Sequence, residues 1–296
     1  MLRSRRWTVP ESRTRAQLNG VAVADGRAYA VGNRGVLLSR TRVGWEPLFD
    51  DGVAGGSRGL LDIAATDDGR RLWLCGTRGA LGYYDRETGN LRDRSTPYGL
   101  ATTFRTLAVA GSAGDERVHV GDDQGRIARL AVDGRETNVR GVALPGPGAP
   151  ITALRGADNM WFAGDTSGRV HQSDDGREWR TDTLSAAMVT ALAIDADGLL
   201  ATNRGGTVYT GVRSFDAPPD RLAPLPDGVR PTDAAGVGHT AVVVGSRGDI
   251  LARGRDPGFQ RVGIDGPAGL YAVTLAPDGT VFAVGADGLV VEGRPR

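Results

Sequence analysis

The residue types that most often carry enzyme chemistry are scarce in this chain and widely spaced. Its three histidines, His119, His171 and His239, lack the HxH or HxxxH spacing that gathers imidazoles around a metal ion. The one cysteine, Cys75, lies in an apolar run, where a packed thiol is expected rather than a reactive nucleophile. These four side chains therefore predict neither a metal site nor a nucleophile.

Paired aspartates and glycine-rich turns could hold calcium or phosphate, but their setting argues against both. The aspartate pairs at 50–51, 122–123 and 174–175 fall in turns, where Asp caps backbone amides, and none has the spacing of a calcium loop. The glycine turns join one apolar run to another, whereas a phosphate loop joins a strand to a helix. Lysine chemistry is excluded because all 36 basic residues are arginine. We predict that the protein is not an enzyme and has no catalytic residue, metal or cofactor.

Arginine is the residue type whose placement does indicate a function, namely binding. One turn of a repeated unit carries an arginine in four places: Arg34, Arg78, Arg204 and Arg247. Arg58 precedes one apolar run and Arg105 opens another, and both are expected at the same end of the fold. A guanidinium binds a carboxylate or phosphate through paired hydrogen bonds, and loops on a rigid scaffold commonly carry binding residues. The alternative is that an arginine-rich chain reuses one convenient residue in its turns.

The elements that must position these arginines repeat through the whole chain. Seven times, an apolar run, a short turn and a second apolar run are followed by a glycine-bounded turn, such as 32–35 or 76–79. Successive turns begin about 40–45 residues apart, a period typical of propeller blades. We therefore predict an all-β fold, a single seven-bladed β-propeller domain over residues 1–296 with about 42 residues per blade.

The first strand of each repeat is expected nearest the axis, where space is least. Small residues share one column of these strands: Ala22, Ala64, Ala108, Ala193 and Ala235. An Asp-Gly turn often follows, which favours a hairpin, and the second strand is almost continuously apolar, as in strands buried on both faces. These patterns predict blades packed face to face around a narrow channel.

The seventh repeat ends before a fourth strand. Residues 6–10, which include Trp7, copy the outer-strand pattern around Trp45 and Trp179. We predict that this segment completes blade seven and closes the ring, which removes an exposed sheet edge. A frayed N-terminal tail is the alternative.

Charge and hydropathy exclude several classes of protein. The net charge is +1, and no block of like charge is available to bind a membrane or nucleic acid. No run approaches the length of a membrane span, and the N-terminal residues lack the apolar core of a signal peptide. We expect a cytoplasmic protein.

One segment carries a family resemblance. Residues 173–179, Ser-Asp-Asp-Gly-Arg-Glu-Trp, resemble a degenerate Asp-box (BNR) repeat, with weaker copies around Trp45 and Phe259. With the inner-strand and Val-Gly-x-x-Gly patterns, the chain is similar to propellers of the photosystem II assembly-factor type and to WD-like repeat proteins. The resemblance implies a propeller in which the Asp-box residues are structural. Sialidases also carry Asp-boxes, but their Phe-Arg-Ile-Pro signature is missing, and residues 104–106 are the nearest string.

Three functions remain open. The first, which we predict, is a non-catalytic protein-interaction scaffold or assembly factor that binds a partner with an acidic surface. The candidate binding residues are Arg34, Arg58, Arg78, Arg105, Arg204 and Arg247. The second is a nucleic-acid or ribonucleoprotein-associated propeller, which the small net charge disfavours. The third is a glycan-binding or sialidase-like propeller, for which Tyr98 and Tyr271 are the candidate aromatics.

Overall fold

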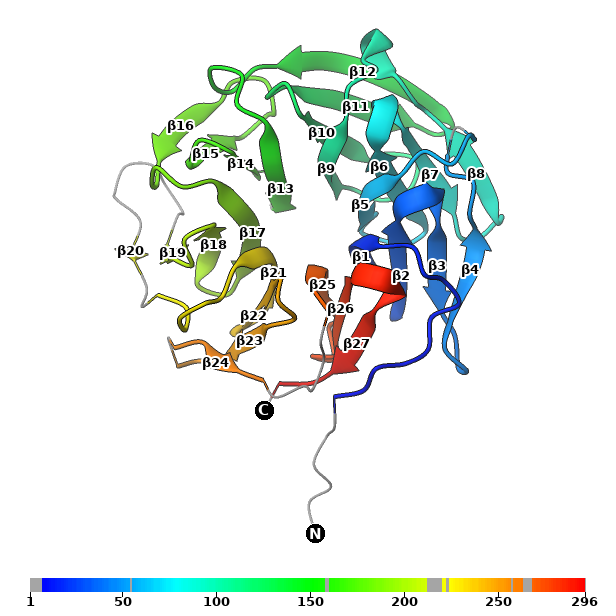
Figure 1. Ribbon diagram of the computed structural model, residues 1–296. Helices are drawn as coiled ribbons and strands as arrows, with labels where there is room; N and C mark the ends of the chain where they lie inside the picture. The colour runs from blue at the N-terminus through cyan, green and yellow to red at the C-terminus, as the bar shows by residue number, and fades with distance from the viewer. Residues whose placement is uncertain are drawn as a thin grey trace.

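Seven small antiparallel sheets stand in a ring around a central axis (Figure 1). The computed structural model describes residues 7–295 apart from 54, 158–159, 212–219, 222–223, 257 and 263–267. Within each sheet the strands pair in the order in which they occur in the sequence. The predicted all-β, seven-bladed propeller is confirmed.

The first four blades each hold four strands. Blade one consists of β1 (Leu18–Ala24), β2 (Arg27–Gly32), β3 (Leu37–Arg40) and β4 (Trp45–Phe49). Blade two consists of β5 (Leu60–Ala65), β6 (Arg71–Gly76), β7 (Leu81–Asp85) and β8 (Asn90–Asp93). Blade three consists of β9 (Phe104–Ala110), β10 (Arg117–Asp122), β11 (Ile127–Asp133) and β12 (Glu136–Ala143). Blade four consists of β13 (Ile151–Ala157), β14 (Met160–Asp165), β15 (Arg169–Ser173) and β16 (Arg180–Thr183).

Blades five and six have outer strands of two residues, and the sheet of blade seven has three strands. Blade five consists of β17 (Val189–Asp195), β18 (Gly198–Asn203), β19 (Val208–Thr210) and β20 (Asp220–Arg221). Blade six consists of β21 (Pro231–Val237), β22 (Thr240–Gly245), β23 (Ile250–Arg253) and β24 (Gln260–Arg261). Blade seven consists of β25 (Leu270–Leu275), β26 (Val281–Gly285) and β27 (Val290–Gly293). Four 3-10 turns join strands: η1 (Asn33–Gly35), η2 (Thr77–Gly79), η3 (Pro97–Gly99) and η4 (Ala286–Gly288).

The core lies between neighbouring blades rather than at one centre. All six residues of β6 are buried, as the continuous apolar pattern of the second strands predicts. Val31 and Leu37 of blade one pack with Ile63 and Leu74 of blade two, and similar clusters fill the other interfaces. Each blade therefore buries its two faces against its two neighbours.

The predicted alanine column faces the axis. Its five alanines line a central cavity of about 540 Å³, which residues from the inner strands of all seven blades enclose. Ala108 and Ala193 are 5% and 1% exposed. Arg155 and Thr274 occupy the same column in blades four and seven and also line the cavity. The small residues thus leave room on the axis into which the long Arg155 side chain extends.

The N-terminal segment contacts both blade seven and blade one. Thr8 pairs with Glu292 of β27 through two backbone hydrogen bonds of 2.8 and 2.9 Å, and the Trp7 ring lies against Gly293. Ser12 then bridges to Trp45, and its hydroxyl donates to the Gly288 carbonyl at 2.5 Å. The pairing of residues 7–10 with β27 is a single bridge rather than a strand, and residue 6 lies outside the described residues. That residues 6–10 close the ring stays a prediction.

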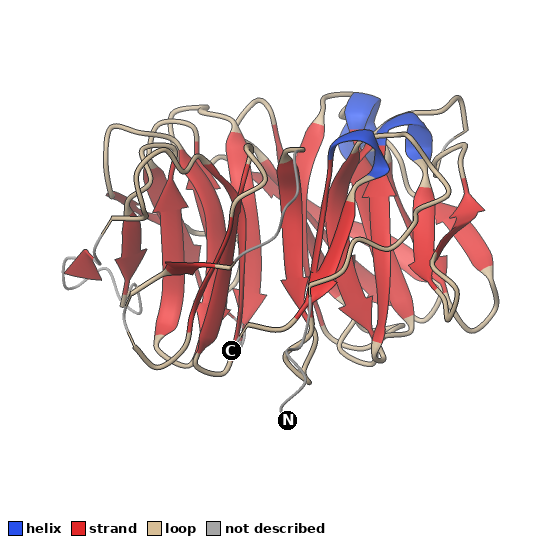
Figure 2. Cartoon of the chain, turned by 60° about the horizontal axis from the view of Figure 1, so that its bottom comes forward, coloured by secondary structure: helices blue, strands red, loops and turns tan. Residues whose placement is uncertain are grey.

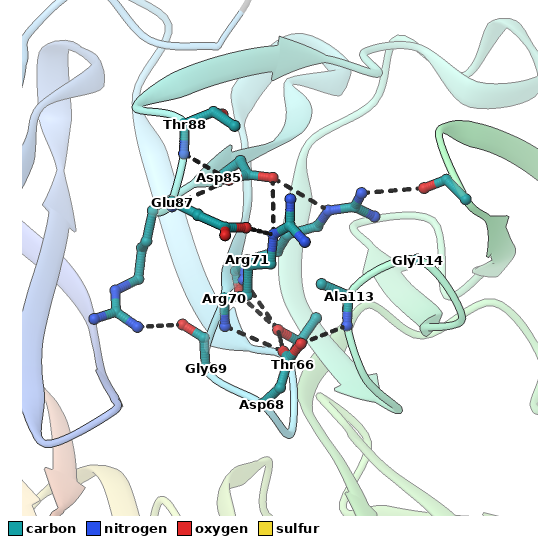
Figure 3. Close-up of polar contacts among 12 residues, drawn as sticks. Thr66, Asp68, Gly69, Arg70, Arg71, Asp85, Glu87, Thr88, Ala113 and Gly114 are labelled. Carbon is teal, nitrogen blue, oxygen red and sulfur yellow. Dashed lines mark hydrogen bonds and ion pairs between the residues drawn. The ribbon is translucent and has the colours of Figure 1, made fainter.

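A buried charged cluster links blades two and three. Arg71 donates to the Glu116 carboxylate at 2.8 Å, and the Trp73 indole donates to the same oxygen at 3.1 Å. Figure 3 shows Asp85 turned toward Arg71, with 3.9 Å between Asp85 Oδ2 and the guanidinium Nε of Arg71. Asp68 reaches across to the Ala113 amide of blade three at 3.2 Å. These contacts fasten two blades at the end of the ring that carries the Asp-Gly turns.

The segment that resembles an Asp-box forms a self-contained turn. Asp175 accepts from the amides of Arg177 and Glu178, and these hydrogen bonds lower the pKa of its carboxyl. The Gly176 amide donates to the Ser173 hydroxyl at 2.8 Å, and the Trp179 indole donates to the Gly176 carbonyl at 3.2 Å. The carboxylate is used within the turn, as a structural role requires. The Asp-box class itself stays a prediction.

Candidate partner-binding face

One end of the ring is built from seven equivalent turns between second and third strands. In every blade, the first residue of this turn donates its amide hydrogen to the carbonyl just before the inner strand, at 2.9–3.0 Å. The donors are Asn33, Thr77, Asp123, Thr166, Arg204, Ser246 and Ala286. This bond places the turns and the blade-to-blade connections on the same side, and Figure 2 shows the 3-10 turns gathered there. We call this end, defined by the seven turns, the turn face.

The candidate arginines lie on the turn face in two groups. Arg34 and Arg78 project from the turns of adjacent blades one and two, and Arg58 donates to the Arg78 carbonyl at 3.2 Å. Arg204 and Arg247 belong to blades five and six, on the other side of the axis (Figure 1). Arg247, like Arg34 and Arg78, is the second turn residue, whereas Arg204 is the first.

The turns of the other three blades do not carry arginine. Blades three and seven place Asp123 and Asp287 there, and blade four places Thr166 and Ser167. The turn face is therefore not a continuous basic ring. It alternates two basic sectors with acidic or neutral ones.

Arg105 lies at the rim of the central cavity. Each inner strand has a bulge at its second residue, which turns that side chain toward the axis. In blades one, four and six this residue bonds the next blade's carbonyl: Asn19 to Leu60, Thr152 to Val189 and Thr232 to Leu270, at 2.7–2.8 Å. Arg105 fills the same position in blade three with an exposed side chain. Where those blades have a side chain that bonds to the next blade, blade three has a guanidinium at the cavity mouth.

Most candidate guanidinium groups have no partner inside the described part of the protein. No hydrogen bond or ion pair joins the side chains of Arg34, Arg78, Arg105, Arg204 or Arg247 to another described residue. By contrast, Arg71 and Arg253 are buried and paired with Glu116 and Asp195. The turn face thus presents cations that the fold does not use.

Arg34 and Arg78 also hold a costly backbone conformation. Their φ angles are +64° and +55°, in the left-handed region that favours glycine or asparagine. The preceding glycines are required because a Cβ on Gly32 or Gly76 would lie 2.2 or 2.0 Å from a backbone oxygen. The turn geometry is therefore fixed by the fold, and arginine at its second position is not the residue that this geometry prefers.

The cavity contains charged residues that the sequence analysis did not select. Asp233 accepts from Arg155 at 3.2 Å and from the Val273 amide at 2.9 Å, and burial raises its pKa to about 6. Asp62 accepts from the Leu107 amide and the Thr106 hydroxyl at 2.9 Å, and burial raises the pKa of its carboxyl. In the sequence, these two residues could have been found as polar residues at inner-strand positions where most other repeats have small or apolar residues. Their bonds join inner strands of different blades, which indicates a structural role.

The three histidines lie in blades three, four and six. His119 stacks on Trp161 with 3.7 Å between ring centroids, and burial lowers its pKa to about 3. His171 is buried beside Asp165, with Nε2 3.4 Å from Oδ2, and burial lowers its pKa. His239 is half-exposed. The described residues contain no group of His, Cys, Asp and Glu that could hold a metal ion.

The chain is a seven-bladed β-propeller, and comparison with known proteins supports that class of fold. No protein-family profile and no curated protein matches the sequence. A streptogramin B lyase structure is similar with a TM-score of 0.81 and 14% identity, over 98% of this chain and 97% of that one. YCF48 bound to D1 peptide is similar with a TM-score of 0.78 and 16% identity, over 100% and 99%. The WD40 repeats of RRP9 are similar with a TM-score of 0.76 and 11% identity, over 98% and 97%.

These likenesses concern architecture. One neighbour is named as a lyase, one is bound to a peptide and one is a WD40 repeat protein, so the fold alone does not select a function. In the part of the chain that is described, none of the helical segments has the length and apolar character of a membrane span.

Proposed function

We propose that this propeller is a non-catalytic interaction scaffold that docks an acidic segment of a partner protein on its turn face. Arg34, Arg58, Arg78 and Arg105 form the binding sector on one side of the cavity mouth, and Arg204 and Arg247 form the other. The neighbour that is bound to a peptide supports a propeller in this role.

The observation that carries the proposal is the conformation of Arg34 and Arg78. A non-glycine residue in the left-handed region raises the free energy of the folded state by about 1–2 kcal/mol. An exposed guanidinium that pairs with no other residue does not offset this cost. Reuse of a convenient turn residue does not account for this, because glycine is the convenient residue at that position. An arginine retained there is better explained by contacts made outside the chain, with carboxylates that it can bind through paired hydrogen bonds.

A matched pair of variants tests the proposal. The turn-face variant changes Arg34, Arg78, Arg204 and Arg247 to Ser. The control variant changes Arg27, Arg42, Arg135 and Arg177 to Ser, four exposed arginines of the hairpin turns at the opposite end. Both lose four positive charges, so any difference between them reports position rather than net charge. Substitutions at exposed positions usually change the free energy of unfolding by less than about 0.5 kcal/mol each.

The readout is the binding of a fluorescent acidic 12-residue peptide, measured by anisotropy at several salt concentrations. The wild-type protein and the control variant should bind alike, and the turn-face variant should bind at least about tenfold more weakly at low salt. Equal loss in both variants, or no loss in the turn-face variant, would contradict the proposal. Tighter binding of a single-stranded RNA, with a steep salt dependence, would favour the nucleic-acid alternative instead.

A further inference from the structure

Tyr98 combines exposure with backbone strain. It lies in η3, in the connection between blades two and three, and is the one aromatic among the large exposed apolar side chains of the described residues, at 50% exposure. Its φ is +57°, and that of Thr96, two residues earlier, is +52°. Two non-glycine residues in the left-handed region within three positions mark this loop as strained.

The loop is fixed rigidly against the turn that carries Arg78. The Thr96 amide donates to the Gly79 carbonyl at 2.8 Å, and the Gly79 amide donates to the Thr102 carbonyl at 2.6 Å. A Cβ on Gly79 would lie 2.4 Å from the Leu100 oxygen, which shows how closely the loop and the turn pack. The backbone that carries Tyr98 is therefore held on the turn face, against the turn that carries Arg78, and has little freedom to move.

The fold covers only half of the Tyr98 side chain. No hydrogen bond or ring contact joins it to another described residue, and half of its surface meets solvent. A rigid, half-exposed tyrosine on the same face as exposed arginines has the composition of an interface hot spot, in which Tyr and Arg are enriched. Such a side chain buries a large area on binding with little loss of conformational entropy.

We propose that Tyr98 is the apolar anchor of the turn face, so that the bound segment carries an apolar side chain beside its carboxylates. This inference rests on the proposed function and specifies the partner's chemistry. A protein segment fits better than a polyphosphate backbone, because Asp123 and Asp287 interrupt the basic sectors of the same face. An apolar residue between acidic ones would place its side chain on Tyr98 and its carboxylates on Arg78 and Arg58.

Two peptides separate this inference from the proposed function. Both are fluorescent 12-residue peptides with the same number of glutamates, one with Leu-Phe at its centre and the other with Ser-Ser. The wild-type protein should prefer the Leu-Phe peptide by about tenfold, the effect of a modest hot spot. Tyr98→Asn, which tolerates the left-handed conformation, should lose this preference and still bind both peptides through the arginines.

Further variants keep the result interpretable. Tyr98→Gly should behave as Tyr98→Asn does, and neither should melt below the wild-type protein, because both relieve the strained φ. Val43→Ser, at an 80% exposed apolar residue of the opposite end, should keep the preference. Equal binding of the two peptides by the wild-type protein, or a preference that survives in both Tyr98 variants, overturns the inference. If the turn-face arginine variant binds both peptides like the wild-type protein, the proposed function fails as well.

Discussion

The buried His119 makes the stability of the propeller sensitive to acid. Its ring is 3% exposed, stacks on Trp161, and neither ring nitrogen has a hydrogen-bond partner within the described residues. Burial, with smaller contributions from the nearby Arg129 and Arg117, lowers its pKa from 6.5 to about 3. His119 therefore binds a proton near pH 6.5 in the unfolded chain, but only near pH 3 in the folded chain. Stability due to this residue is complete above pH 6.5 and is lost as the pH falls.

The size of the effect follows from the two pKa values. Between pH 7 and pH 5, a group shifted from 6.5 to about 3 costs the folded state about 2 kcal/mol. His119→Leu removes the titrating group at similar volume, so its free energy of unfolding should fall less over this interval, by that amount. The absolute stability of the variant is not the test, because Leu also loses the ring stacking.

The assay is urea unfolding followed by circular dichroism at several pH values between 5 and 7. His239→Leu is the matched control, because it makes the same substitution at a half-exposed histidine outside the packing between blades three and four. If His119→Leu and the wild-type protein show the same slope, His119 is not buried as a neutral ring and the packing between blades three and four is misassigned.

Three further predictions concern the ring itself. Deleting residues 1–10 removes the Thr8–Glu292 bridge and the Trp7 packing and should lower the melting temperature, at a cost of several kcal/mol; an unchanged value would reject closure. Ala193→Leu should overpack the axis by about 1–3 kcal/mol in urea unfolding, and full tolerance would show that the inner strand is misplaced. Glu116→Ala should cost about 3–5 kcal/mol by the same assay, because the buried Arg71 loses the carboxylate to which it donates at 2.8 Å, whereas a loss below about 1 kcal/mol would contradict that.

The architecture was readable from the sequence because the repeat is long, regular and carries the pattern of buried strands. The burial of β6 on both faces and the small residues along the axis follow from local sequence patterns and were confirmed. The bounds of individual strands were harder to predict from the sequence. The outer strand predicted at residues 6–10 contributes one bridge, because the chain leaves β27 after Thr8 and contacts blade one.

Of the candidate site, the sequence predicted only which turns carry it. The sequence placed four arginines in equivalent loops, but not the left-handed conformation of Arg34 and Arg78, which depends on the carbonyl that Gly32 and Gly76 approach. It also gave no sign of the strained presentation of Tyr98, which depends on packing against Gly79. The cavity residues Asp62, Arg155 and Asp233 were missed because they interrupt columns in which most repeats carry small residues: Asp62 and Asp233 share one column, and Arg155 lies in the alanine column.

The central claim is that a partner docks on the turn face, and hydrogen–deuterium exchange of the intact protein tests it most directly. With the acidic Leu-Phe peptide bound, exchange should slow at residues 33–36, 77–80 and 96–102, whose amides lie beside Arg34, Arg78 and Tyr98. The hairpin turns at residues 25–27 and 41–44, at the opposite end of the ring, should exchange as in the free protein. Protection confined to those hairpin turns, with none at the turn face, would contradict the account.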